Sequence, residues 1–321
     1  MTTYIIRRLL IAIPLLLAMT FVTFMFVHLA PGNYFDTLRM NPQFSPETIK
    51  KYESQYHLDQ PALIQYGWWL KSILRFDLGY SFSLNSPVTR VIKGRLFNTF
   101  ILSLSAMVFT WCIAIPLGIF CAVRQNKISD RFFSALSFVG LSIPNFFFAL
   151  LLLYLVSLTG LLPLGGMYSA EYESLSGLGK LGDLFKHLII PTIVIGAGSL
   201  AGLQRIMRGN MLEVLRAQYI TTARAKGLPE GRVIYVHALR NAINPLITIF
   251  GYSLSGLLSG AALTEIIIGW PGLGTVMLQA VRSQDLFLVM GSMLMGGVLL
   301  IAGNLIADVL LAWSDPRIQY K

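Results

Sequence analysis

Six apolar stretches recur along the chain, and each is close to the length that a helix needs to cross a membrane. They cover residues 9–30, 98–123, 132–159, 188–204, 244–264 and 286–307. Spanning about 30 Å of hydrocarbon takes roughly 20 consecutive apolar residues in an α-helix. Because backbone polar groups in lipid must be satisfied within their own segment, we predict six transmembrane helices. The runs are continuous rather than short and alternating, which disfavours a β-barrel.

The polar stretches between these runs divide the chain into five segments. We predict an N-terminal transmembrane helix over 1–30, an extracytoplasmic loop over 31–95, a five-helix core over 96–312 that contains a polar loop over 205–243, and a tail over 313–321. The core helices are expected over about 98–123, 132–159, 188–204, 244–264 and 286–308. The first run is longer than the apolar region of a cleaved signal peptide, so we interpret it as a retained anchor.

A Trp-rich stretch of the outer loop, residues 61–76, is amphipathic. Such a helix tends to lie in the plane of the membrane interface. A small packed cap without ligand contacts explains the same pattern equally well. The sequence leaves both interpretations open.

The distribution of lysine and arginine predicts the orientation, because short cytoplasmic loops carry the excess of these residues. With the N-terminus inside, fourteen basic residues fall in inner segments, and three fall in short outer loops (Lys180, Lys186 and Arg282). Arg90, Lys93 and Arg95 disagree with this rule, because they stand just outside the second helix on the predicted outer side. We therefore expect both termini in the cytoplasm.

Composition excludes several classes of protein. Hydrophobic residues make up 55% of the 321-residue chain and charged residues only 12%, about half the charged fraction of soluble domains. A soluble enzyme and a disordered chain are both excluded. The net charge of +10 is mostly explained by topology, so no nucleic-acid partner is expected. Charges are nearly absent from the apolar runs, which disfavours an ion-coupled carrier.

No residue pattern indicates catalysis or metal binding. Cys112 and Cys121 are nine residues apart on one predicted helix, too far apart in angle to pair. No phosphate-binding loop exists, because Gly177-Leu-Gly-Lys180 is followed by Leu181. We predict no catalytic, cofactor-binding or metal site in this chain.

Small residues recur at four-residue spacing within the runs. The pairs are Gly198 with Gly202, Gly256 with Gly260, and Gly303 with Ala307. This spacing predicts close approach of helix backbones in a bundle or a dimer.

The polar loop 205–243 has the most distinctive pattern. Seven basic residues stand there against Glu213 and Glu230. We predict a helix over 211–226, a left-handed Gly227 after its end, and a second helix opened by Pro229. Val233, Val236, His237 and Leu239 are expected to continue one mixed apolar face. Such a helix–turn–helix could dock in the groove of a partner protein. The same pattern also fits a segment that only connects two transmembrane helices.

Motifs along the whole chain resemble one family of transporters. Tyr219-Ile-Thr-Thr-Ala-Arg-Ala-Lys-Gly227-Leu228 and His237-Ala-Leu-Arg-Asn241-Ala-Ile-Asn-Pro245 resemble the cytoplasmic "EAA" loop of ABC importer permeases, in the version of the dipeptide, oligopeptide and nickel branch. Four more motifs are similar to that branch: Leu29-Ala-Pro-Gly32, Asp77-Leu-Gly-Tyr-Ser81, Glu265-Ile-Ile-Ile-Gly-Trp270 and Asp315-Pro-Arg317. Thr221-Thr222-Ala223 stands where the family name prescribes Glu-Ala-Ala, which removes an acidic residue that would contact the ATPase.

The resemblance implies an all-α, type I ABC importer permease in the bacterial inner membrane. It implies a second permease subunit (a heterodimer), two cytoplasmic ATPases that bind ATP and Mg²⁺, and an extracytoplasmic binding protein. It implies that substrate crosses by alternating access. The expected ATPase-coupling residues are Tyr219, Thr222, Ala223, Arg224, Ala225, Lys226, Gly227, Leu228, Val233 and His237, with Leu228 and Val233 anchored in the partner's groove. The residues that line the substrate pathway are not identified.

Peptides are the commonest substrates of the branch, so a di- or oligopeptide importer is expected. Nickel chelates or glutathione-like solutes are the alternative within the family. An ion-coupled secondary carrier is the remote alternative from another class. An intramembrane enzyme is excluded because no catalytic pair is found in the runs.

Overall fold

The computed structural model describes residues 2–32, 34–39, 45–256 and 262–314. The predicted tail, including the Asp315-Pro-Arg317 motif, lies almost entirely outside the described residues, as does Gly260 of one predicted small-residue pair. The chain divides into two compact units. One comprises residues up to 99 with 271–302, and the other comprises 100–270 with the residues from 303 onward.

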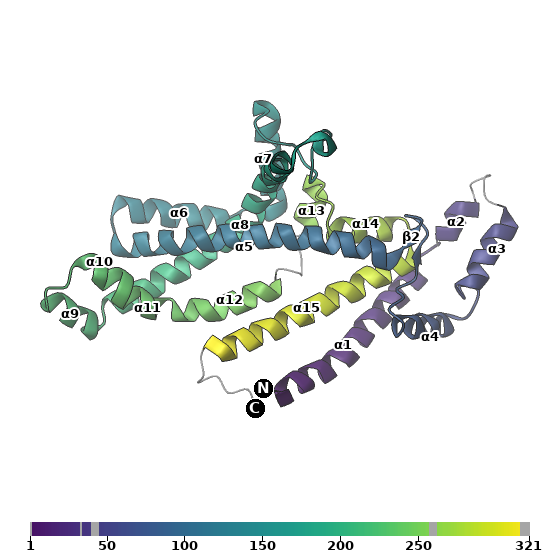
Figure 1. Cartoon of the computed structure of the whole chain (residues 1–321), viewed down its shortest axis with the longest axis horizontal. Helices are drawn as coiled ribbons and strands as arrows, with labels where there is room; N and C mark the ends of the chain where they lie inside the picture. Colours follow the sequence, from purple (N-terminus) through teal and green to yellow (C-terminus); the bar gives the residue numbers. More distant parts are fainter. Residues whose placement is uncertain (1, 33, 40–44, 257–261, 315–321) are drawn as a thin grey trace. The chain divides into compact units, whose positions relative to one another are not determined.

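The described chain is almost entirely helical (Figure 1). The helices are α1 (Thr2–Leu29), α2 (Tyr34–Arg39), α3 (Pro46–Gln55), α4 (Ala62–Ile73), α5 (Val88–Val123), α6 (Ile128–Ser142), α7 (Asn145–Thr159), η1 (Tyr172–Ser174), α8 (Gly177–Leu215), α9 (Gln218–Ala225), α10 (Glu230–Arg232), η2 (Val233–Ala238), α11 (Leu239–Ala242), α12 (Asn244–Gly256), α13 (Ala262–Ile268), α14 (Leu273–Arg282) and α15 (Leu286–Ser314). Strands β1 (Tyr80–Ser81) and β2 (Ser86–Pro87) pair antiparallel.

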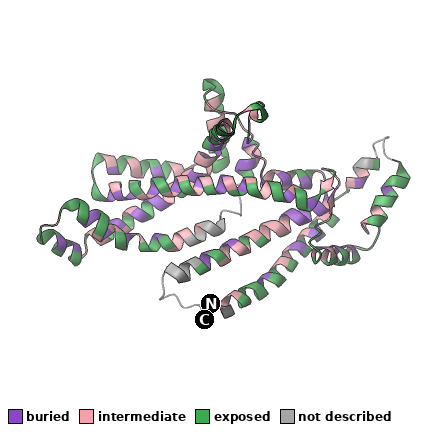
Figure 2. Cartoon of the chain, viewed as in Figure 1, coloured by how far each residue is buried: buried purple, intermediate pink, exposed green. Residues whose placement is uncertain are grey.

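Four helices are long and apolar enough to cross a membrane: α1, α5, α8 and α15. Two bent pairs pass the same criterion, so the described residues supply four spans, or up to six if each pair is one span. Much of α1 is exposed (Figure 2), as expected of a helix that faces lipid. The structure therefore agrees with a polytopic helical membrane protein.

The prediction of one continuous helix over 132–159 is wrong. The structure has α6 and α7 instead, bent by 106° at Ile143-Pro144. Proline has no N–H to donate and disfavours a helical conformation in the residue before it, and Ile143 is extended (φ −87°, ψ 121°). α6 lies along α8 and against α5, where Phe133 meets Phe120, while α7 turns away from α6 (Figure 1).

Close helix approaches occur at other glycines than the predicted pairs. A Cβ on Gly118 of α5 would lie 2.7 Å from Cβ of Met207 on α8, and one on Gly196 would lie 2.7 Å from the Phe109 ring. At Gly202 no described atom lies within 4 Å of such a Cβ, so Gly202 makes no close helix contact with the described part of the chain.

In the first unit, α4 packs against α1 through one of its faces. The hydroxyl of Tyr66 lies 2.9 Å from that of Thr20, and the Tyr66 ring meets Phe24. The opposite face of α4 leaves Leu63, Ile64 and Trp68 exposed. The outer-loop helix thus has both a packed face and an exposed apolar face, which combines the two interpretations left open by the sequence.

Asp285 joins the β-hairpin to α15 in this unit. The carboxylate is fully buried and accepts hydrogen bonds from the Ser81 hydroxyl (2.7 Å), from the Ser83 hydroxyl (2.8 Å) and from the Ser83 backbone N–H (2.9 Å). It also caps α15 by accepting from the Leu288 N–H at 3.3 Å. Four donors from two segments thus converge on one side chain.

Asp285→Ala is expected to lower the free energy of unfolding by about 3 kcal/mol, because it removes an N-cap and leaves buried serine donors unsatisfied. Thermal unfolding of the purified protein in detergent measures the loss. Ser283→Ala is the control, because that hydroxyl bonds only to carbonyls of its own turn, Gln279 and Ala280. Equal melting temperatures for Asp285→Ala and Ser283→Ala would contradict the anchoring role.

Candidate functional site

The 205–243 segment folds as the end of α8, then α9, α10, the π-helical η2 and α11. The predicted helix over 211–226 is wrong in one respect, because it is interrupted at Arg216-Ala217, between α8 and α9. Helices α9 to η2 form a hairpin over residues 218–238, which projects at one end of its unit (Figure 1).

The turn of this hairpin has the predicted left-handed glycine. Gly227 has φ +75°, and its N–H donates to the Arg224 carbonyl at 2.9 Å. The Leu228 N–H donates to the Ala223 carbonyl at 3.4 Å. These two bonds form a Schellman motif, which ends a helix and satisfies its last carbonyls. Pro229 precedes α10 at the N-cap, one residue before its first helical position.

The inner face of the hairpin is apolar and packs on the helices of its own unit. Ile220, Ala223, Val233, Ile234 and Ala238 are buried in one cluster. The same cluster contains Ala122 of α5 and both Met207 and Met211 of α8. The hairpin and the helices α5 and α8 thus share one close-packed core, and close-packed side chains resist deformation.

The role predicted for Val233, an anchor in a partner's groove, is wrong. Its side chain is 0% exposed within this chain, so it holds the hairpin to its own core and cannot enter a partner's groove. Ala223 is buried as well. Leu228 is half-buried and packs at the edge of the same cluster.

Most of the other predicted coupling residues are exposed. The exposed ones are Tyr219, Thr222, Arg224, Ala225, Lys226 and Gly227, and His237 is half-buried. Asn241 donates to the Tyr219 hydroxyl at 2.9 Å, which ties α9 to α11. The structure thus brings the predicted residues together but divides them between two faces.

Two exposed residues were missed or misplaced by the sequence analysis. Tyr235 is 64% exposed and Val236 is 56% exposed, although both lie in an apolar stretch. The expected face of Val233 with Val236 does not form: the π-helical η2 buries Val233 and Ile234 and exposes Val236. Its wider turn shifts the register of an ordinary helix, and such turns are frequent at functional sites. An aromatic residue, Tyr235, in this polar loop was the feature of the sequence that could have indicated an exposed contact surface.

An ion pair closes the hairpin across its turn. The Arg224 guanidinium donates to both carboxylate oxygens of Glu230, at 3.1 Å and 2.6 Å. This hydrogen bond raises the pKa of Arg224 above its ordinary value. Both side chains are exposed, so the pair orders the turn and contributes little stability.

A second ion pair ties α8 to the start of α6. Arg208 donates from Nε and from its terminal nitrogen to the two oxygens of Asp130, both at 2.7 Å. The Asp130 carboxylate is buried and also accepts from the Asn126 N–H at 2.9 Å. Arg208 thus links the α5–α6 turn to the helix that leads into the hairpin.

A chamber of about 500 Å³ opens in the second unit. Helices α5, α7, α8 and α12 contribute to its walls, which include Ser103, Trp111, Asn145, Ser199, Gly202 and Ser253. None of the described residues that line it carries a charge. Its volume falls in the range of roughly 300–1,000 Å³ that is typical of ligand sites.

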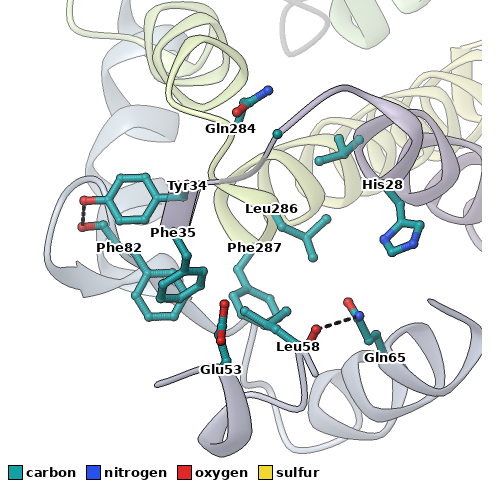
Figure 3. Close-up of a pocket in the computed structure, with 12 residues that line it drawn as sticks. His28, Tyr34, Phe35, Glu53, Leu58, Gln65, Phe82, Gln284, Leu286 and Phe287 are labelled. Carbon is teal, nitrogen blue, oxygen red and sulfur yellow. Dashed lines mark hydrogen bonds between the residues drawn. The ribbon is translucent and has the colours of Figure 1, made fainter. Parts of the chain in front are cut away.

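A smaller cavity of about 160 Å³ lies in the first unit (Figure 3). Tyr34, Phe35, Phe82 and Phe287 line one side, and the Tyr34 hydroxyl donates to the Phe82 carbonyl at 2.9 Å. Gln65, across the cavity, donates to the Leu58 carbonyl at 3.1 Å. Phe35 and Phe82 pack edge to face at 4.8 Å, so these rings form a packed aromatic cluster.

Family models match nearly the whole chain. Residues 114–320 match the binding-protein-dependent transport system inner membrane component. Residues 1–105 match the N-terminal part of the binding-protein-dependent transport system membrane component.

Curated relatives match the chain from end to end. It is 40% identical over 322 residues to the oligopeptide transport system permease protein AppB of Bacillus subtilis, covering 100% of both chains. It is 36% identical to the dipeptide transport system permease proteins DppB of Alkalihalophilus pseudofirmus and of Escherichia coli strain K12, again over 100% of both chains.

Proposed function

The chain belongs to the family of binding-protein-dependent transport system inner membrane components, and on that premise we propose that it imports di- and oligopeptides as one subunit of an ATP-driven transporter. The family is one of transport permeases, so this multi-pass membrane protein is not an enzyme. The peptide substrate is inferred from relatives whose names specify oligopeptide and dipeptide transport.

The 218–238 hairpin is the observation that carries the proposal. Its inner face is buried against α5 and α8, while its outer face exposes Tyr219, Tyr235 and Val236 beside basic side chains. Exposed aromatic side chains with arginine are typical of protein interfaces. We propose that this outer face docks on a cytoplasmic ATPase, and that the buried inner face transmits the movement of that ATPase to the spans.

The proposed arrangement has six spans, with α6–α7 counted as one and the predicted run 244–264 as another, and both termini in the cytoplasm. A sister permease, two ATPases that bind ATP and Mg²⁺, and an extracytoplasmic binding protein complete the transporter. ATP binding and hydrolysis then drive alternating access, and this chain supplies no group to that chemistry. In this orientation α4 lies at the outer interface, where the exposed Trp68 next to Lys71 suits lipid headgroups.

The test is uptake by the complete transporter reconstituted in vesicles. We expect accumulation of a labelled dipeptide that requires ATP, both ATPases and the loaded binding protein. The permease pair without ATPases, held under a proton or sodium gradient, is the control for an ion-coupled carrier. Uptake by the pair alone would contradict the proposal. Uptake of a nickel chelate or glutathione in place of peptide would contradict the assigned substrate.

A further inference from the structure

The chamber in the second unit has polar side chains that the protein itself does not satisfy. Among the described residues, the structure gives no hydrogen-bond partner to the side chains of Ser103, Asn145 and Ser199. Ser103 is 8% exposed, and it lines the chamber from α5. Several other serines in the spans donate to their own helices, as Ser137 does to Phe133 and as Ser253, which also lines the chamber, does to Ile249. The Ser292 hydroxyl of α15 is buried and has no partner among the described residues.

This difference matters at membrane depth. A hydroxyl that faces hydrocarbon bonds to its own helix, because an unsatisfied polar group in lipid costs several kcal/mol. Ser103 and Ser199 lie within the apolar runs 98–123 and 188–204, yet they are left without such bonds. Asn145 stands at the bend between α6 and α7 and supplies a carboxamide beside them. The wall is therefore suited to a polar occupant rather than to lipid tails.

The chemistry of the wall also defines the occupant. Hydroxyl and carboxamide groups match the donor and acceptor of a peptide unit, while the absence of charge among the lining residues leaves no partner for a carboxylate or an ammonium group. Trp111 and Ile206 add apolar surface for side chains, and the Trp111 ring packs edge-on against Phe250 at 5.1 Å. A wall of this kind binds main chain and tolerates varied side chains.

We infer that this chamber is where a transported peptide contacts this subunit, with Ser103, Asn145 and Ser199 as the groups that bind its main chain. The inference rests on the proposed peptide import. If the inference holds, the chamber selects peptides by the space that it offers them and not by their charge. Gly202 of α8 controls that space, because it lines the chamber and nothing lies within 4 Å of a Cβ placed on it.

Gly202→Leu tests the inference, because it adds a side chain at a position that lines the chamber and has open space for a Cβ. We expect uptake of a pentapeptide to fall by about tenfold or more and uptake of a dipeptide by less than about threefold, since the clash grows with ligand size. ATP hydrolysis stimulated by the loaded binding protein should persist. Uptake is measured in vesicles that contain the complete transporter.

Gly209→Leu is the matched control, because Gly209 lies on the same helix, has equal space around it and does not line the chamber. It should transport both peptides as the wild type does. Normal pentapeptide uptake by Gly202→Leu would overturn the inference. An equal loss of uptake of both peptides, together with a loss of ATP hydrolysis, would also overturn it, because it would indicate that a helix of the sister subunit fills the chamber. Failure of the wild-type transporter to import peptide would instead refute the proposed function.

Cysteine labelling gives a second readout that does not require Gly202→Leu to assemble. Ser199→Cys, in a chain with Cys112→Ser, should react with a maleimide-bearing dipeptide during turnover, and an excess of plain dipeptide should slow the reaction. Leu150→Cys is the control, because Leu150 is exposed on α7 outside the chamber. Equal labelling of both cysteines, or no protection of Ser199→Cys by peptide, would overturn the inference.

Discussion

Gly227→Pro is expected to leave membrane insertion and ATP hydrolysis intact while reducing peptide uptake by about 5- to 150-fold, the range of a coupling free energy of about 1–3 kcal/mol. Proline fixes φ near −65° and has no N–H. Gly227 needs φ +75° and donates to the Arg224 carbonyl. The Schellman motif cannot form in the variant, so the chain leaves α9 in a different direction and the proposed docking face for the ATPase is distorted.

The measurements are uptake and ATP hydrolysis by the same reconstituted transporter. Gly227→Asn is the matched variant, because asparagine tolerates the left-handed region and keeps its N–H. Nothing lies within 4 Å of a Cβ at this position, so the added side chain meets no obstacle. We expect Gly227→Asn to transport close to the wild-type rate. Full uptake by Gly227→Pro would show that the hairpin does not couple the two activities.

Asp130→Ala is expected to lower the free energy of unfolding by about 3–5 kcal/mol, because it leaves the Arg208 guanidinium partly buried without its partner. Asp130 is the acceptor of both 2.7 Å bonds from Arg208 and of the Asn126 N–H. The loss should appear as a lower melting temperature in detergent. Since Arg208 stands two turns before the end of α8, peptide uptake by the surviving protein should also fall.

Two further variants separate the effect of the charge from that of packing. Glu173→Ala breaks the exposed pair with Lys180, and it should cost less than about 1 kcal/mol. The double variant Asp130→Leu with Arg208→Met should recover much of the stability, because a buried pair can be replaced by packed apolar groups. If Asp130→Ala and Glu173→Ala melt at the same temperature, the buried pair has no special role.

The apolar runs predicted most of the helices correctly because membrane burial acts on each residue where it stands. The run 9–30 lies within α1 up to Leu29, where the helix ends, and the run 286–307 lies within α15. The helices extend beyond the runs, however: α5 begins at Val88 and α8 ends at Leu215. Arg90, Lys93 and Arg95 are the basic residues that disagree with the predicted orientation, and they lie on the first turns of α5. Helix continuation depends on backbone hydrogen bonds, which polar residues form equally well.

The sequence predicted where the hairpin of the candidate site lies in the chain. It predicted only in part which of its residues are buried and which are exposed. The left-handed Gly227 and the break at Pro229 follow from local backbone preferences. The division of residues between inner and outer faces did not follow, because the packing of the hairpin on α5 and α8 decides that Val233 is buried and Val236 is exposed. No local signal marks the break at Arg216-Ala217, where the chain leaves α8.

The sequence by itself determined that this protein is a multi-span helical membrane protein with one basic, helical hairpin, because hydropathy and turn chemistry are properties of residues and their near neighbours. Only the tertiary structure decided which distant groups meet. Asp285 accepts from Ser81, Asp130 pairs with Arg208, and Ser103, Asn145 and Ser199 face one chamber. Such encounters depend on how helices pack, and packing is set by the whole chain at once rather than by any segment of it.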